Sequence, residues 1–431
     1  MTRTSLYISN WSLNEPLCQS QTLPYLRALA ADGYRFCLIT FERAPYALSR
    51  DEARRMKPRL LAEGICWHPL RYHKRSSSFI ALYDAGRAFA TAMAVAIQHR
   101  PRIVHTRTSV PAGLGLLLAR MLRRRFLYDA DSELSAEYAD GGYWSRGDLC
   151  YRMLSCVEAL CRRHADAVVV LTERMRADFA TRGVQAAVTV IPCCVDLERF
   201  RFDEQQRDAR RRELLIDREK VLVYVGKTGP RYMVDEMMAF AATIERTIGR
   251  VRVLVLTHDD AGVFHEIAAR NGLPQTAIAV RRVAHDDVPG WLSAADAGLA
   301  LIRPTASERG SSPIKISEYL ANGLPVVTSP LIGDMSAAIE DRGLGVVLAD
   351  MSESSRVAAA QRLSVLWRNP EAVRARCADW ARSSVDVQGV GAARYIAVYQ
   401  SLVGGAHSIE IAKAANTAKN RNPRLEDACD G

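Results

Sequence analysis

Residues 311–327 read SSPIKISEYLANGLPVV and combine the start of a helix with the means to bind an anion. Ser312 can cap a helix, Pro313 fits a first helical position, and Gly323 ends the helix before an apolar pair. The pattern therefore predicts a helix over residues 313–322.

A strand and a loop precede this helix in the sequence. The apolar run 297–302 is typical of a buried parallel strand, and residues 303–311 are polar and turn-prone. In an open α/β sheet this order brings free backbone N–H groups and the positive end of a helix dipole to the carboxyl edge of the strands, where phosphates bind. The backbone at Ser311 and Ser312 is therefore a candidate anion site.

Glu318 lies deeper on the predicted helix. A carboxylate there can accept hydrogen bonds from both hydroxyls of a ribose, although an ordinary helix glutamate would give the same pattern. The segment resembles the C-terminal signature of the retaining GT-B glycosyltransferases of family 4, the glycosyl transferases of group 1. The resemblance implies a donor-binding site that includes Ser311, Ser312, Lys315 and Glu318.

One position departs from the family pattern. The signature has two glutamates eight residues apart, and Gly310 stands eight residues before Glu318. The nearest carboxylate is Glu308, which is the candidate for the missing glutamate that contacts the donor sugar. We count it among the candidate catalytic residues.

The resemblance also implies an α/β fold of the GT-B type, with two Rossmann-like domains whose parallel sheets face a central cleft. A length of 431 residues fits two such domains. The run IPCCVDLERF resembles the family motif that ends the first domain. The predicted divisions are an acceptor-binding domain over 1–203, a linker over 204–219, a nucleotide-sugar-binding domain over 220–385, a helix over 386–403 that braces the first domain, and a flexible tail over 404–431.

The first domain carries polar residues at the carboxyl ends of two predicted strands. His105 and Arg107 lie at the end of one strand, from which they would reach toward a donor bound by the second domain. Related enzymes have a histidine there close to the donor sugar, and either residue could take that place, so both are candidate catalytic residues. Asp131 and Glu137 follow the next strand and are predicted on the acceptor side.

The second domain opens with KVLVYVGKTGPRYM, residues 220–233. Residues 221–225 are typical of a buried strand, and Gly226 allows the backbone to approach a ligand closely. Lys227 and Arg231 can neutralise a diphosphate, as basic residues after this strand do in the family. Solvated turn charges would be the alternative interpretation.

Basic residues are concentrated in the first half of the chain. Residues 1–200 carry 28 Lys and Arg against 19 Asp and Glu, whereas the remainder carries 30 against 29. This excess suits an anionic partner such as a membrane surface or a lipid-linked pyrophosphate. No recognition motif for nucleic acid is present, so we expect no nucleic-acid partner. The apolar spacing along 149–164 predicts a core-facing helix, with a helix lying on a membrane as the alternative.

The cysteines give no sign of a metal site. Ten occur without a CxxC pair or a His/Cys ligand spacing, so no zinc site is predicted. Asp129 and Asp131 form a DxD pair, but it falls in the first domain, and GT-B enzymes generally work without a metal. We therefore expect no metal and no other cofactor. Neither a signal peptide nor a membrane span is predicted, which favours a cytoplasmic protein that can lie at the inner face of the plasma membrane.

Taken with the resemblance, these patterns predict a glycosyltransferase that moves a sugar from a nucleotide-diphosphate sugar to a glycan or lipid-linked acceptor with retention, in bacterial surface polysaccharide synthesis. Two other functions fit the sequence. A GT-B sugar-nucleotide epimerase would share the nucleotide pocket but need acid and base groups on both sides of the sugar. A non-catalytic nucleotide-binding homologue would keep Glu318 and lack the first glutamate.

Overall fold

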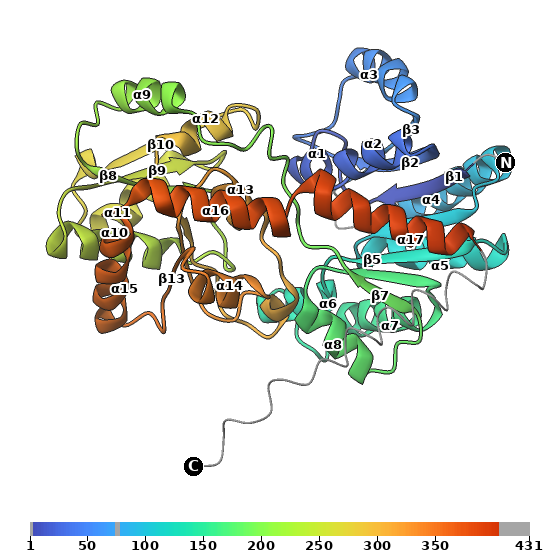
Figure 1. The fold of residues 1–431 in the computed structure, drawn as a ribbon. Coiled ribbons are helices and arrows are strands. Elements are labelled where there is room, and N and C mark those ends of the chain that lie inside the picture. Colours follow the sequence, from blue (N-terminus) through green and yellow to red (C-terminus); the bar gives the residue numbers. More distant parts are fainter. Residues whose placement is uncertain (1–2, 74–77, 405–431) are drawn as a thin grey trace.

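The computed structural model describes residues 3–73 and 78–404. It contains two parallel sheets, one in each half of the chain, with helices connecting successive strands (Figure 1). The predicted pair of Rossmann-like α/β domains is thereby confirmed. Of the tail predicted over 404–431, all but the first residue lies outside the described residues.

The first domain is built on a seven-stranded sheet of order β3-β2-β1-β4-β5-β6-β7. Its strands are β1 Arg3–Ser9, β2 Tyr34–Glu42, β3 Ile65–Arg71, β4 Ile103–Arg107, β5 Arg125–Ala130, β6 Ala167–Val170 and β7 Ala187–Val190. The helices are α1 Pro16–Gln21, α2 Leu23–Ala31, α3 Arg50–Ala62, α4 Ser78–His99, α5 Ser109–Met121, α6 Leu134–Asp140, α7 Leu149–His164 and α8 Glu173–Thr181.

The second domain is built on a six-stranded sheet of order β10-β9-β8-β11-β12-β13. Its strands are β8 Lys220–Val225, β9 Val251–Leu256, β10 Ile278–Arg281, β11 Ala297–Ala300, β12 Val326–Thr328 and β13 Gly345–Val347. The helices are α9 Glu204–Glu213, α10 Val234–Thr247, α11 Ala261–Arg270, α12 Val288–Ser293, α13 Ile314–Ala321, α14 Met335–Asp341, α15 Glu353–Leu366 and α16 Pro370–Ser384, with short 3-10 turns η1 Gln275–Ala277 and η2 Ser307–Gly310.

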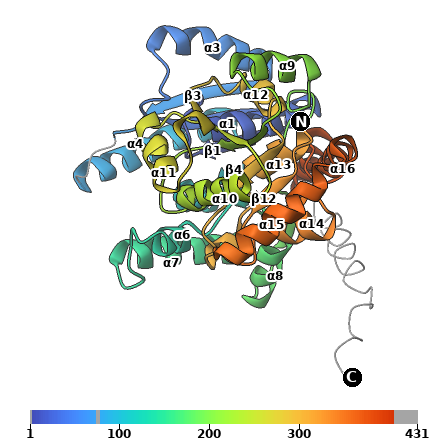
Figure 2. The same ribbon diagram turned by 90° about the vertical axis from the view of Figure 1, so that its left-hand side faces the viewer.

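Helices cover both faces of the second sheet. One face packs on α10, α11 and α15, and the other on α12, α13, α14 and α16 (Figure 2). Because both faces are covered, the central strands read as nearly continuous apolar runs; residues 221–224 of β8, for example, are all buried. The hydrophobic burial of this two-sided core fixes the carboxyl ends of the strands and the loops that follow them.

The chain crosses between the domains twice, and the two crossings are joined. The backbone N–H of Val195 donates to the carbonyl of Val385 at 2.8 Å, and that of Val387 donates to the carbonyl of Val195 at 3.0 Å. Beyond this point a π-helical turn, η3 Val387–Ala392, leads into α17 Ala393–Val403, which lies against the first domain (Figure 1). Tyr395 and Tyr399 of α17 are buried in the first domain's core.

Two segments differ from the sequence prediction. Residues 204–219, predicted as a linker, contain α9, which packs on α12 of the second domain. On α7, the face predicted to lie in the core is exposed at Leu149 and Met153, which keep 71% and 61% of their surface in solvent. The helix buries its other side against α5 and α6, so amphipathic spacing identified the helix but assigned the wrong face to the core. No helix of residues 3–73 and 78–404 is long and apolar enough to cross a bilayer.

Candidate active site

Arg231, in the loop between β8 and α10, contacts the 3-10 turn η2 and the serine that follows it. Its Nε lies 2.7 Å from Oε1 of Glu308, and its Nη2 donates to Oε2 of Glu308 at 2.9 Å. The same Nη2 donates to Oγ of Ser311 at 2.7 Å. The structure thus brings together Arg231, Glu308 and Ser311, which the sequence analysis had placed in the site and which come from two separate segments of the chain.

Lys315, in the first turn of α13, has a buried amine without a hydrogen-bond partner among the described residues. Its Nζ lies over the rings of Tyr232 and Tyr224, at 3.9 and 4.5 Å from their centroids. The pKa of Lys315 is lowered to about 7, first because burial disfavours the charged amine and then because Arg231 lies near, while Glu318 acts in the opposite direction. An anion that enters the site would stabilise the protonated form of this amine.

Gly226, at the end of β8, makes room for this amine. It has a φ of +152°, and a Cβ built there would lie 2.8 Å from Nζ of Lys315 and 2.9 Å from the Tyr224 hydroxyl. The glycine is required here for the close approach of a side chain, whereas the sequence suggested the approach of a ligand. The next residue, Lys227, is exposed at the cavity described below.

The start of α13 differs from the predicted cap. Pro313 occupies the N-cap position and makes no side-chain capping hydrogen bond. The Ser312 hydroxyl accepts a hydrogen bond from the backbone N–H of Cys193 at 3.2 Å, and Ser317 Oγ donates to the Cys193 carbonyl at 2.9 Å. These contacts fasten α13 to the end of the first domain and leave the positive end of the helix without a cap from the side chain at its N-cap position.

Glu318 is buried on α13, with its Oε1 3.8 Å from Nε2 of His285. His285 lies in the loop between β10 and α12, and its backbone carbonyl accepts a hydrogen bond from Arg199 Nη2 at 2.6 Å. This histidine was missed as a site residue. No local sequence pattern links it to Glu318, because the two residues are 33 positions apart.

A cavity of about 410 Å³ opens beside Arg231 and Glu308 and is lined from both domains. The second domain contributes the loop 227–232 and η2, and the first contributes α6 with Glu137, Tyr138 and Asp140. Asp140 also fastens the two walls, because its carboxylate accepts a hydrogen bond from the Ser307 N–H at 3.0 Å. Tyr138 and Asp140 were missed by the sequence analysis.

Glu137 faces the charges of the second domain. Burial raises the pKa of Glu137, Arg231 acts to lower it, and Glu308 acts to raise it. Burial also raises the pKa of Asp131 to about 7, against the lowering effect of Arg107. The side chain of Asp131 keeps 15% of its surface exposed and lies 4.0 Å from Arg107 Nε. The carboxyl groups of both acceptor-side candidates therefore have pKa values above the usual range.

His105 and Arg107 lie in a buried network beneath α17 and do not line the cavity. Arg107 Nη1 donates to Asp129 Oδ2 at 2.9 Å, and the Tyr395 hydroxyl lies 2.6 Å from the same oxygen. The His105 Nδ1 lies 2.8 Å from the Tyr399 hydroxyl. Arg107 ends β4 and His105 lies two residues before that end, and α17 covers both.

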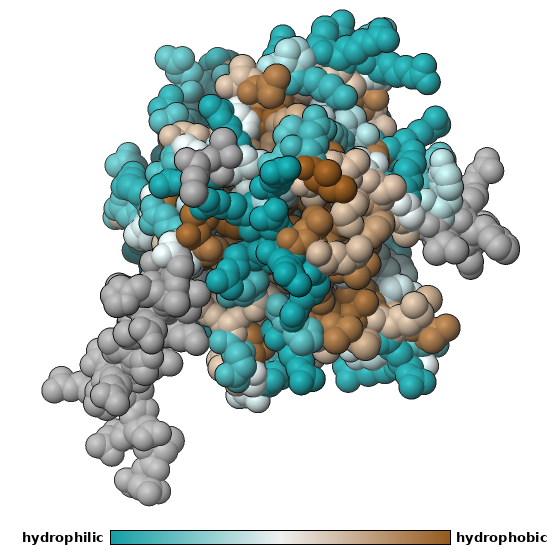
Figure 3. All heavy atoms as spheres, turned by 90° about the vertical axis from the view of Figure 1, so that its right-hand side faces the viewer, coloured by the Kyte–Doolittle hydropathy of each residue, from teal (hydrophilic) through white to brown (hydrophobic). Residues whose placement is uncertain are grey.

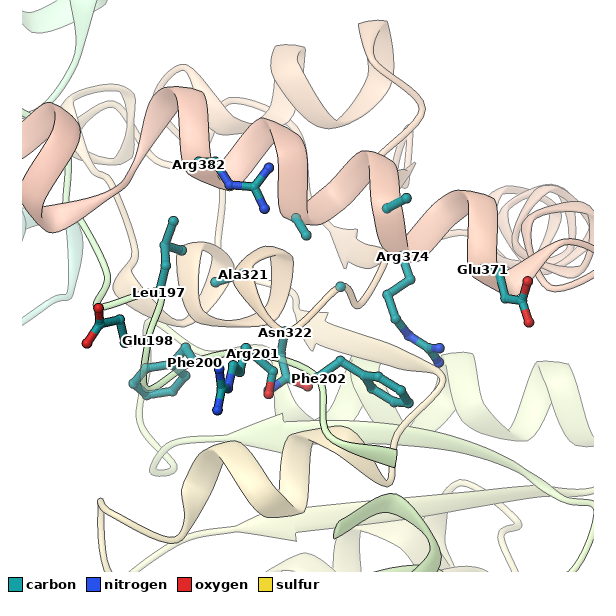
Figure 4. A pocket seen from close by; sticks show the side chains of 13 residues that line it. Leu197, Glu198, Phe200, Arg201, Phe202, Ala321, Asn322, Glu371, Arg374 and Arg382 are labelled. Atoms are coloured by element: carbon teal, nitrogen blue, oxygen red, sulfur yellow. The ribbon is translucent and has the colours of Figure 1, made fainter. Parts of the chain in front are cut away.

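A second cavity, of about 570 Å³, lies at the other end of α13 (Figure 4). It is bounded by residues 197–202 and α16, and Arg374 stacks over the Phe202 ring at 3.4 Å. The negative end of the α13 dipole points this way, and none of the predicted site residues lines this cavity. The cavity beside Arg231 is lined by the predicted residues Lys227, Arg231 and Glu308, whereas Ser311, Ser312, Lys315 and Glu318 line neither cavity.

Two Rossmann-type domains with a basic, carboxylate-bearing cavity between them define the GT-B class of sugar-transferring enzymes. Family models agree with this class. The model described as a glycosyl transferase 4-like domain matches residues 18–194, and the model described as glycosyl transferases group 1 matches residues 219–365. Together they span well over half of the chain, which therefore belongs to the GT-B glycosyltransferases, as the sequence resemblance indicated.

Solved structures show the same fold. Sucrose-phosphate synthase from Thermosynechococcus elongatus superposes with a TM-score of 0.70 at 15% identity, covering 94% of this chain and 100% of that one. Anabaena HepE in complex with UDP-glucose gives 0.69 at 14% identity, with 91% and 99% covered. WaaG, a glycosyltransferase involved in lipopolysaccharide biosynthesis, gives 0.66 at 16% identity, with 93% and 100% covered. No curated protein sequence gives a significant match.

Proposed function

We propose that this glycosyltransferase moves a sugar from a nucleoside-diphosphate sugar to a glycan or lipid-linked acceptor with retention of the anomeric configuration. The main support for a nucleoside-diphosphate sugar as donor is the buried amine of Lys315. This amine has no hydrogen-bond partner among the described residues and lies near Arg231 and the start of α13. A buried amine without a hydrogen-bond partner at a helix N-terminus favours an anionic ligand. A diphosphate satisfies that requirement.

The rest of the donor has ready partners around the same helix. Glu318 can bind the ribose hydroxyls, and Lys227 at the cavity can approach the distal phosphate. HepE, whose fold this chain shares, was crystallised with UDP and with UDP-glucose. We therefore put a uridine nucleotide first among the donors to be tested.

Glu308 is proposed to replace the first glutamate of the family signature. A Cβ at Gly310 would lie 3.2 Å from Sδ of Met175 on α8, so that position packs tightly against the first domain. Glu308 is buried, lines the cavity and is held by Arg231. Its carboxylate can therefore contact the sugar from a position two residues earlier in the chain.

The transfer step needs no protein nucleophile in this proposal. Arg231, Lys315 and the α13 dipole stabilise the negative charge that develops on the departing diphosphate. The acceptor hydroxyl then attacks the anomeric carbon from the face on which the diphosphate leaves and passes its proton to the departing diphosphate oxygen, which retains the configuration. Approach of the two domains around the cavity would exclude the water that otherwise hydrolyses the donor.

The acceptor is proposed to enter a neighbouring cavity of about 590 Å³ between α6, α7, α8 and η2. This cavity and the donor cavity share Asp140 and Ser307 in their linings, so they adjoin. The lining is rich in guanidinium groups, contributed by Arg146, Arg162, Arg174, Arg182 and Arg309. Such a lining suits a phosphorylated acceptor, which agrees with a role in surface polysaccharide synthesis.

The first domain is proposed to dock on the anionic inner face of the plasma membrane through α5 and α7, in an otherwise cytoplasmic protein. Apolar side chains gather in patches on the face of this domain that is turned away from the second domain (Figure 3). The exposed apolar side chains of the two packed helices are Val110, Leu117, Met121, Leu149, Met153 and Leu160. Exposed arginines flank them at 120, 123, 152 and 163. Pelleting with phosphatidylglycerol vesicles that is lost in Met153→Glu would support this placement.

The donor assignment is tested by thermal shift with UDP, GDP, ADP and CMP, followed by the Glu318→Ala and Lys227→Ala variants. Stabilisation by one nucleotide that falls at least about tenfold in apparent affinity in Glu318→Ala supports the site. Glu266→Ala, an exposed glutamate on α11, is the matched control. A nucleotide that binds all variants equally well would place the donor elsewhere.

The two alternatives differ in turnover. A non-catalytic homologue would bind the nucleotide without consuming the nucleotide sugar, and a sugar-nucleotide epimerase would convert the donor without an acceptor. Product analysis by NMR, with and without acceptor, separates both from a transferase and also reports the anomeric configuration. An inverted product would contradict the retaining mechanism.

A further inference from the structure

Three residues with metal-binding side chains meet at the outer part of the first domain, away from the donor cavity. The ligand atoms of Cys37 on β2, His68 on β3 and His99 at the end of α4 all lie within 4.8 Å of one another. They come from three elements that are far apart in sequence. No other group of at least three His, Cys, Asp or Glu side chains in the described part of the chain comes together in this way.

Cys66 supplies a further candidate ligand next to His68. Cys66 pairs directly with Cys37 in the register of β2 and β3, so both side chains leave the same face of the sheet. Its Sγ lies 3.4 Å from Nε2 of His68. Cys37 packs in the core between this sheet and α4, which confirms that this is the face that α4 covers.

We propose that Cys37, Cys66, His68 and His99 bind a zinc ion. Two thiolates and two imidazoles form a tetrahedral ligand set typical of structural zinc, and the hard cations magnesium and calcium prefer oxygen. Bond lengths of about 2.0–2.3 Å put ligand atoms on one zinc ion about 3–4 Å apart, so the ligand atoms of Cys37, His68 and His99 must approach one another by about 1 Å. Cys66, which contacts His68 but lies outside that group of three, must turn its Sγ toward the other ligands. Each cysteine binds as a thiolate, and its proton passes to solvent.

The ion has a route to the site and a structural role there. Cys66, His68 and His99 are only partly buried, so zinc can reach them from solvent, while Cys37 anchors the inner side. Strands β2 and β3 form one edge of the seven-stranded sheet, and α4 ends at His99. A zinc ion would therefore fasten the end of α4 to this edge, independently of the donor site.

Cobalt(II) tests the proposal on the untagged full-length protein, kept reduced and stripped of metal by chelator. We expect one equivalent of Co²⁺ to give a thiolate-to-cobalt charge-transfer band and visible d–d bands, which zinc then removes. Cys37→Ser should abolish the charge-transfer intensity from that ligand, and His99→Ala should weaken cobalt binding by more than about tenfold. Since Cys37 is in the core, His99→Ala carries the test if Cys37→Ser does not fold.

Two matched controls and a redox measurement complete the test. Cys150→Ser changes an exposed cysteine on α7, and His164→Ala changes the histidine that ends α7 as His99 ends α4; both should bind cobalt as the wild type does. Zinc should also raise the unfolding midpoint of the wild type by several degrees and that of His99→Ala by less. Absence of the cobalt bands, equal bands in the Cys37 and His99 variants, or a Cys37–Cys66 disulfide in the purified protein would overturn the proposal.

Discussion

Two polar clusters in this molecule collect most of the residues that its sequence marks as functional, and they differ in how their charges are paired. In the first domain, Arg107 and Asp129 are buried together and covered by Tyr395. In the second domain, Arg231 pairs with Glu308, but the amine of Lys315 is buried without a hydrogen bond to any described residue. We call the first the α17 network and the second the donor cluster.

We infer from this difference that the paired charges of the α17 network stabilise the fold, whereas the unpaired amine of the donor cluster binds a ligand. A buried ion pair whose partners neutralise one another is tolerated, and removing one partner leaves an uncompensated charge. A buried amine near other cations stays uncompensated until an anion arrives, and its lowered pKa records that conflict. The α17 network should therefore respond to mutation through stability, and the donor cluster through binding.

The largest expected effect is on stability in the α17 network. Asp129→Ala leaves Arg107 buried without its carboxylate and should lower the free energy of unfolding by about 3–5 kcal/mol. The measurement is the denaturant midpoint of the wild type and the variant. Asp178→Ala is the matched control, because Asp178 pairs with Arg182 at 2.7 Å on the surface and should lose at most about 1 kcal/mol. Equal losses in the two variants would remove the distinction between the clusters.

The next effect is on binding in the donor cluster. Lys315→Met keeps the length and apolar stem of the side chain but removes the amine, and should weaken nucleoside-diphosphate binding by about tenfold to a hundredfold. Its stability should stay equal or rise, because an uncompensated buried cation is removed. Calorimetric titration with UDP measures the first expectation and thermal unfolding the second. Lys57→Met, on an exposed position of α3, should change neither. A destabilised variant with unchanged affinity would assign Lys315 to the core.

The lowered pKa of Lys315 also leads to a prediction of how nucleotide binding depends on pH. Its pKa in the free protein is about 7, and a bound diphosphate favours the protonated amine, so binding takes up a proton when the pH is above that value. The affinity should therefore fall as the pH rises from 7, by up to about tenfold per unit, until the pKa of the complex is reached. The same titration series in Lys315→Met should lack this slope. A wild type whose affinity is flat between pH 7 and 9 would contradict a protonated Lys315 in the complex.

The sequence predicted the local structure around the donor cluster, although the donor role of these residues stays a prediction. Gly323 has a φ of +77° and ends α13 as expected, and Glu318 follows from helical spacing along the same segment. The contact between Arg231 and Glu308 spans 77 positions, so spacing could name both residues but not pair them. Ser312 was misread as a cap because its partner, Cys193, belongs to the other domain.

The first domain was harder to predict because α17 returns to it from the end of the chain. Arg107 ends β4 at the edge where catalytic side chains gather, and the sequence correctly located this strand, with His105 two positions before its end. Tyr399, 294 positions further along the chain, covers His105, and no local sequence pattern predicts that contact. The cysteine and histidine group around His68 was not predicted for the same reason, since its members come from three separate elements.

The smallest expected effect tests whether the two clusters act separately. Tyr399→Phe removes the hydroxyl that lies 2.8 Å from Nδ1 of His105 and should lower the free energy of unfolding by about 1 kcal/mol, the contribution of one neutral hydrogen bond. Burial lowers the pKa of His105, so the imidazole stays neutral and no charge is left uncompensated. Tyr83→Phe, at an exposed position of α4, is the control for loss of a hydroxyl. UDP affinity should be unchanged in Tyr399→Phe, because α17 contacts the first domain and the donor cluster belongs to the second. If the affinity instead falls together with the stability, α17 transmits the state of the first domain to the donor site, and the two clusters form one unit.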